Sequence, residues 1–300
     1  MRLKEIAWLL VSLFILVLIY QTTNASRIFQ LDPTLFVVSF ACYFLSIVFW
    51  ILAWGYLIKE RFIPSLRLNM KALLGVFAPF GLGGDAIRTY LAKTEKIEPE
   101  RALSASFVIK FYKFILMFLF LLLAIYLLAT NSVDFSKNIA IFISMIFMVI
   151  GGAIVVFLLR LPSFTKLLYR ILNRVFIFKF NEQLNRHFLG IKPKDAVIIF
   201  SLLLVSTFLE IAAVYFAFAA IGQGLLLPHV LIFSSVASSL ALVTITPQGM
   251  GFVEAGGYFV LSIGYFSLAK PVIGSFLIVW NIIRIWIPSL IGLFSLRWKR

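Results

Sequence analysis

The chain has few of the residues that enzymes use for redox, metal or nucleotide chemistry. Its 300 residues include one cysteine and two histidines, and only 13% of them are charged. The single cysteine, Cys42, excludes a disulfide within the chain, and His187 and His229 lie too far apart for a metal-ligand cluster. A phosphate-binding loop of the G-x-x-x-x-G-K type is also missing. We therefore expect no cofactor and no metal.

The sequence is instead rich in apolar residues. They make up 62% of the sequence, and the mean hydropathy is +1.06, whereas soluble domains carry roughly 25% charged residues. These values predict an all-α polytopic membrane protein in which residues 1–300 form a single membrane domain. The net charge of +15 does not indicate nucleic acid here, because the basic residues flank apolar segments. In that position they set orientation and attract anionic headgroups, so we expect anionic membrane lipids as partners.

Long apolar segments give the positions of the expected spans. The first lies within residues 1–24, with Trp8 and Tyr20 near its ends as interface anchors, and the alternative is a cleaved signal peptide. Because Arg2 and Lys4 precede it, we expect a protein of the cell membrane with a cytoplasmic N-terminus. The remaining complete spans are expected at 34–58, 102–130, 139–159, 196–220, 252–268 and 272–296.

Two glycine-rich breaks interrupt this pattern, and both read Pro-x-Gly-x-Gly followed by an acid. The first contains Pro79, Gly81, Gly83, Gly84 and Asp85, and the second contains Pro247, Gly249, Gly251 and Glu254. With 10 prolines and 17 glycines, chance gives about 0.03 such patterns in this length, so we infer an internal repeat. The alternative is a pair of ordinary Gly/Pro loops.

The first break is expected to follow a re-entrant half-helix. Residues 64–77 are too few and too charged to cross a core of about 30 Å, so they are expected to dip in from the cytoplasm and stop at the break. Asp85 then caps a helix that runs to about residue 92, with Arg88 one turn inside it. Residues 225–245, before the second break, form either a second half-helix or a complete span. The chain thus has seven or eight spans, and eight is favoured because it puts the basic C-terminus inside.

These segments predict two inverted repeats. Repeat A covers 33–159 and repeat B covers 196–296, and the basic linker 160–195 between them is expected to lie in the cytoplasmic interface. Three spans separate the start of the second span from the start of the fifth, so the repeats enter the bilayer in opposite directions. Secondary transporters use this architecture to place a binding site near the midplane, between discontinuous helices.

Seven charged residues are expected inside the membrane, where each costs about 2.5–3.5 kcal/mol or more unless it is paired or hydrated. They are Asp85, Arg88, Lys110, Lys113, Glu210, Glu254 and Arg284. The bases outnumber the acids, so the cavity that they line is expected to bind an anion such as a lipid phosphate. Glycine lets a headgroup approach the backbone, and helix starts present N–H groups. The expected substrate site therefore also includes Gly81, Gly83, Gly84, Gly249, Gly251 and Asn281.

Several of these residues also have a purely structural interpretation. Arg284, with Asn281 one turn before it, has no route to the interface, but it could simply pair with one of the two glutamates. Lys110 and Lys113 could extend to the membrane surface, and Asp85 could be only a helix cap. The residues expected to be structural are Pro79, Pro247 and Glu210.

The two motifs resemble the membrane region of lysylphosphatidylglycerol synthases, a flippase-like family of integral membrane proteins. The resemblance rests on P-x-G-x-G-G-D-x-x-R at 79–88, on T-P-x-G-x-G-x-x-E at 246–254, and on the layout of nearly the whole chain. It implies a role in moving a lipid between leaflets. Full-length synthases continue into a soluble aminoacyl-transferase domain, which this sequence lacks, so we expect no lipid aminoacylation. Such proteins also carry an acid–arginine pair early in the third span, where this chain has Lys110 and Lys113.

Three functions agree with these features. We expect first a translocase or flippase-like transporter of an anionic phospholipid or lipid-linked headgroup. One alternative is a membrane-embedded enzyme that uses Asp85 and Glu254 as acid and base, although neither has a nucleophile nearby in the sequence. Another is an accessory or scaffold subunit whose basic linker docks a partner enzyme of lipid or glycolipid synthesis.

Overall fold

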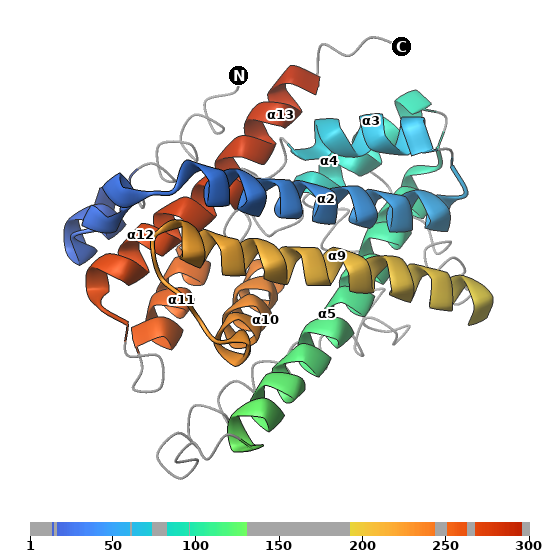
Figure 1. Cartoon of the computed structure of the whole chain (residues 1–300). Helices are drawn as coiled ribbons and strands as arrows, with labels where there is room; N and C mark the ends of the chain where they lie inside the picture. Colours follow the sequence, from blue (N-terminus) through green and yellow to red (C-terminus); the bar gives the residue numbers. More distant parts are fainter. Residues whose placement is uncertain are drawn as a thin grey trace.

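A computed structural model of the chain describes residues 14, 17–60, 62–73, 83–95, 97–130, 193–243, 251–262 and 268–295. Every regular element in these residues is a helix (Figure 1), which confirms the predicted all-α class. The helices are α2 (Pro33–Ile58), α3 (Phe62–Ala72), α4 (Gly83–Ala92), α5 (Pro99–Thr130), α9 (Pro193–Ala220), α10 (Leu227–Val243), α11 (Phe252–Ser262), α12 (Lys270–Asn281) and α13 (Ile287–Ser295). Short 3-10 turns lie at Ser26–Gln30 and Lys93–Glu95, and a π-helical turn at Ile282–Trp286 joins α12 to α13. Most of the expected first span, the expected fourth span and nearly all of the expected linker lie outside the described residues.

Four helical stretches are long and apolar enough to cross a membrane, so the chain is a multi-pass membrane protein. They are Pro33–Ile58, Pro99–Leu128, Lys194–Ala220 and Lys270–Ser295, and they coincide with spans expected at 34–58, 102–130, 196–220 and 272–296. α10 has 17 residues and rises about 26 Å, a length between those of a half-helix and of a full span. α11 is described over 11 residues, Phe252–Ser262, and residues 263–267 of the span expected at 252–268 lie outside the described residues.

Local sequence explains why α2 begins and ends where it does. The Asp32 side chain accepts the backbone N–H groups of Thr34 and Leu35 at 2.8 and 3.1 Å, and Pro33 occupies the first helical position. At the other end Lys59 takes the left-handed conformation, with a φ of 55°, and terminates the helix. The chain then turns sharply, and α3 returns against α2.

The return of α3 depends on a small residue in α2. A Cβ atom at Gly55 would lie 2.7 Å from the Ser65 hydroxyl oxygen on α3. α3 begins at Phe62 and has 11 residues, which rise about 17 Å and cannot cross the hydrocarbon core. This length agrees with the half-helix expected before the first break, although the described helix begins two residues earlier than expected.

α2 and α9 lie side by side and run antiparallel along their whole length (Figure 1). Hydrogen bonds join the two helices at four levels. From one end to the other the contacts are Asp32 N–H to Ala220 O (2.7 Å), Ser39 Oγ to Ala213 O (2.6 Å), Ser46 Oγ to Ser206 Oγ (3.1 Å), and Tyr56 Oη to Asp195 Oδ1 (2.9 Å). The first three contacts are separated by seven residues, or about two turns, on both helices. Small residues permit this close approach of two membrane helices.

The same order of elements occurs twice in the described residues. A long helix, a short helix, a glycine-rich break, a short helix and a long helix follow one another from α2 to α5. They follow one another again from α9 to α13 if α12, the π-helical turn and α13 count as one span. The first helices of the two series are antiparallel, as inverted repeats require. The boundaries 33–159 and 196–296 stay a prediction, because residues 131–192 lie outside the described ones.

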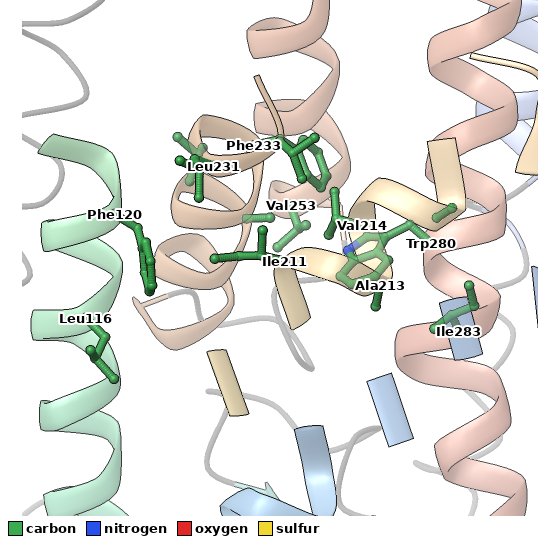
Figure 2. Close-up of a cluster of buried hydrophobic side chains, with 14 of the residues drawn as sticks. Leu116, Phe120, Ile211, Ala213, Val214, Leu231, Phe233, Val253, Trp280 and Ile283 are labelled. Atoms are coloured by element: carbon green, nitrogen blue, oxygen red, sulfur yellow. The ribbon is translucent and has the colours of Figure 1, made fainter. Parts of the chain in front are cut away.

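The apolar core lies where α5, α9, α10, α11 and α12 meet (Figure 2). Phe218 of α9 stacks on Phe276 of α12 with ring centroids 3.5 Å apart, and Phe233 of α10 meets Phe276 edge-on at 4.8 Å. Gly257 of α11 makes room for this group, because a Cβ atom there would lie 2.9 Å from the Phe233 ring. Lipid tails are as apolar as these side chains, so close packing rather than water exclusion stabilises such helix contacts.

Candidate functional site

The first charged cluster joins α4 to α5. The Asp85 carboxylate is buried and receives Arg88 on one oxygen and Lys110 on the other, so a single carboxylate is shared by two cations. The structure corrects one expectation, because α4 begins at Gly83 and Asp85 is therefore its third residue rather than its cap. From this position in the first helical turn, the carboxylate faces the two cations.

The Arg88 guanidinium is held by two further contacts. Its Nη1 also donates to Ser106 Oγ at 2.9 Å, and its central carbon lies 4.4 Å from the ring centroid of Trp50 on α2, a cation–π geometry. Trp54 Nε1 donates to the same hydroxyl at 3.2 Å. Among the described residues, Arg88 Nε–H has no hydrogen-bond acceptor, although it is buried. The guanidinium is thus fixed in place with one donor still available.

The second pair connects three helices. Lys113 Nζ of α5 lies 2.5 Å from Glu210 Oε2 of α9, and Ser238 Oγ of α10 donates to Glu210 Oε1 at 2.8 Å. Lys110 and Lys113 are three residues apart, so they lie on one face of α5 and connect the first cluster to this pair. Both lysines contact buried carboxylates and are only 23% and 19% exposed, which differs from the alternative in which they extend to the surface.

The third pair joins α11 to the π-helical turn. Arg284 Nη2 donates to Glu254 Oε1 at 3.1 Å, and both side chains are buried. Glu254 Oε2 also accepts the backbone N–H of Gly251, which precedes the helix. This is the acid half of a capping box, and Gly251 takes a φ of 82° that favours glycine. Of the two glutamates considered as partners of Arg284, the structure pairs it with Glu254.

Arg284 lies in a widened stretch of the last span. Pro288 has no N–H to donate, and its ring would clash with the carbonyl four residues earlier, which is that of Arg284. The helix widens just before the proline, where the N–H of Ile287 donates to the carbonyl of Ile282, five residues back. Such π-turns often occur at functional sites. Asn281, one residue before this turn, is buried.

The two halves of the chain repeat one arrangement. Asp85 is the third residue of α4, Glu254 is the third residue of α11, and both helices follow a glycine-rich break. Each carboxylate pairs with a cation on the long helix that follows: Lys110 is 25 residues later and Arg284 is 30 residues later. Composition and spacing predicted the acids, whereas the structure supplies their partners.

The remaining predicted residues are placed only in part. Gly83 and Gly84 begin α4, whereas Pro79, Gly81, Pro247 and Gly249 lie outside the described residues. Sequence reasoning missed Trp50, Ser106 and Ser238, because a tryptophan or a serine in an apolar helix gives no signal of its own. Within the described residues, no group of three or more His, Cys, Asp or Glu side chains could hold a metal ion.

Comparison with known proteins identifies the family of this chain. A search among curated proteins found no match. Residues 6–292 match the family described as the lysylphosphatidylglycerol synthase TM region. That match covers nearly the whole chain, including both glycine-rich breaks and the seven charged residues described above. The chain therefore belongs to the lysylphosphatidylglycerol synthase TM-region family, as its two motifs predicted.

Proposed function

We propose that this protein is a lipid translocase that moves an anionic phospholipid or lipid-linked headgroup between the two leaflets of the cell membrane. The observation that carries the proposal is the repeated carboxylate–cation pair, one in each half of the chain, on helices that follow glycine-rich breaks. Membership of a membrane family related to lipid modification and translocation supports it. The basic residues Arg2 and Lys4 support a cytoplasmic N-terminus.

The first cluster is suited to receive the headgroup. Two cations share Asp85, so an incoming phosphate can replace the carboxylate on either of them, and the free Nε–H of Arg88 provides another donor. The start of α4 at Gly83 adds backbone N–H groups and the positive end of a helix dipole. The binding energy comes from charge-assisted hydrogen bonds to a phosphate.

The carboxylates act as substitutes for the headgroup when it is absent. A cation left alone at this depth would cost several kcal/mol, and a paired one would cost much less. Asp85, Glu210 and Glu254 each neutralise a base while the site is empty. The headgroup then passes from base to base, from Lys110 through Lys113 to Arg284, by displacing each carboxylate in turn.

Nucleotide hydrolysis by this chain is not expected to drive the passage, because the sequence has no phosphate-binding loop of the G-x-x-x-x-G-K type. Alternating access comes from rocking of the two halves. A gradient, or a partner enzyme that produces the lipid in one leaflet, would then set the direction.

A test uses purified protein in liposomes that contain fluorescent lipids of matched chains, either anionic phosphatidylglycerol or zwitterionic phosphatidylcholine. An impermeant reductant bleaches the outer leaflet and reports movement. We expect faster movement of the anionic lipid, and its loss in Arg284→Ala and Asp85→Asn. Arg27→Gln is the matched control, because Arg27 is an exposed arginine outside the site.

The outcomes separate the proposal from its alternatives. Movement of both lipids at one rate, unchanged in Arg284→Ala, would contradict a charge-selective site. If folded protein moves neither lipid, the function is that of an enzyme or of an accessory subunit of lipid synthesis. The next step would then be to identify the partner enzyme by affinity purification.

A further inference from the structure

An apolar groove lies between α2, α3 and α13. Its volume is about 480 Å³, which is within the range of about 300–1,000 Å³ for ligand pockets. The lining residues are Phe44 and Val48 of α2, Phe62, Leu66 and Met70 of α3, and Ile291, Phe294 and Ser295 of α13. Only one of the eight is polar, so the groove suits a hydrocarbon chain.

The groove is separate from the charged site. Successive residues of an α-helix are rotated by about 100°, which places Phe44 and Val48 on a different face of α2 from Trp50 and Trp54. The tryptophans contact Arg88 and Ser106 of the first cluster. The two sites thus use different faces of the same helix, about 120° apart, and occupancy of the groove does not require the charged residues.

The surroundings of the groove indicate a lipid as its occupant. α2 and α13 belong to membrane spans, and the rim residues Phe62 and Phe294 are 43% and 68% exposed. In a membrane protein, side chains exposed at this position face the acyl chains of the bilayer. The occupant is therefore a lipid chain from the bilayer.

Basic residues beside the groove indicate the charge of the headgroup. Arg67 and Lys71 follow the lining residues Leu66 and Met70 directly in α3, on the adjoining face of that helix. Among the described residues, the buried Arg67 Nε–H has no hydrogen-bond acceptor. A lipid phosphate would supply that acceptor and a charge-assisted hydrogen bond.

We propose that the groove between α2, α3 and α13 binds one acyl chain of an anionic phospholipid, whose phosphate is bound by Arg67 and Lys71. This is a second lipid site, and it does not depend on the proposed transport function. The bound lipid fills the space between α3 in the first half of the chain and α13 in the second half. It therefore stabilises the contact between the C-terminal end of the last span and the half-helix.

Native mass spectrometry tests this proposal. Protein in detergent is titrated with equimolar phosphatidylglycerol and phosphatidylcholine of identical chains, and the lipids retained per chain are counted. We expect wild type to retain one phosphatidylglycerol in the groove in preference to phosphatidylcholine, in addition to any lipid that the charged site retains. Leu66→Trp fills the groove and should lose the bound lipid, whereas Arg67→Gln should retain a lipid but lose the preference.

Control variants keep the experiment decisive. Ile63→Trp adds the same bulk on α3 at a residue that is 62% exposed and does not line the groove, so retention should be unchanged. Asp85→Asn should also retain the lipid, which separates this site from the transport site. If Leu66→Trp does not fold, Val48→Phe fills the groove from α2. Equal retention of the two lipids by wild type, or full retention in the folded filling variant, would overturn the proposal.

Discussion

Removing Arg284 should destabilise the protein, and removing its partner as well should restore stability without restoring transport. Arg284→Met leaves Glu254 as a buried carboxylate whose remaining partner is the backbone N–H of Gly251. Breaking one side of a buried ion pair typically costs about 3–5 kcal/mol, which lowers the folding equilibrium constant by a factor of about 200 to 5,000. Glu254→Gln, which strands the arginine instead, should cost a similar amount.

The double variant Arg284→Met/Glu254→Gln removes both charges. Replacing a buried pair by neutral groups of similar size is often neutral or stabilising, so most of the loss should be recovered. Unfolding is measured by titrating SDS into mixed micelles, and lipid movement is measured in liposomes for the same four proteins. A coupling energy near zero would refute the buried pair, and a double variant that still moves anionic lipid would refute the role of Arg284 in transport.

Three further perturbations test other parts of the site. Asp85→Asn leaves two cations together, whereas after Lys110→Met the Asp85 carboxylate still has Arg88 as a partner. Asp85→Asn should therefore destabilise the protein in SDS titration by more than Lys110→Met does. Equal losses of stability would contradict the shared carboxylate. Gly251→Ala forces an L residue into a left-handed conformation and should cost about 1–2 kcal/mol in the same assay; an unchanged midpoint would refute this local geometry. Pro288→Ala allows the widened turn to return to an α-helix, so it should preserve stability but reduce lipid movement in liposomes; unchanged transport would show that the π-turn is not needed.

The fold class and the acids of the site could be predicted from the sequence for one physical reason. Burying an ionised group in an apolar segment costs so much free energy that its presence alone marks the residue as a candidate for the site. A glycine-rich break within an apolar segment is an equally clear signal. Asp85 and Glu254 were found in this way, each next to its break. Arg284 was found because it stands in the middle of a span with no route to the surface.

The partners of these acids could not be predicted in the same way. A helix places Lys110 and Lys113 on one face, but the sequence does not say that one meets Asp85 and the other meets Glu210, since that depends on how α5 packs against α4 and α9. The start of α4 was expected at Asp85, and it lies two residues earlier because glycine can also occupy a first turn. Pro288 is the sequence signal for the widened turn at Arg284, because a proline inside a helix disrupts the backbone hydrogen bonding of the turn before it.

The seam between α2 and α9 limits how the two halves of the chain can move. Side-chain and backbone hydrogen bonds tie the two helices at both ends and at two intermediate levels. Sliding one helix along the other would break all four contacts at once. Rotation about the line where the two helices touch keeps those contacts nearly in place, so this line is the rotation axis that the hydrogen bonds permit. Any alternation between the two membrane faces then consists of tilting about that axis. The charged pairs farthest from the axis undergo the largest displacement.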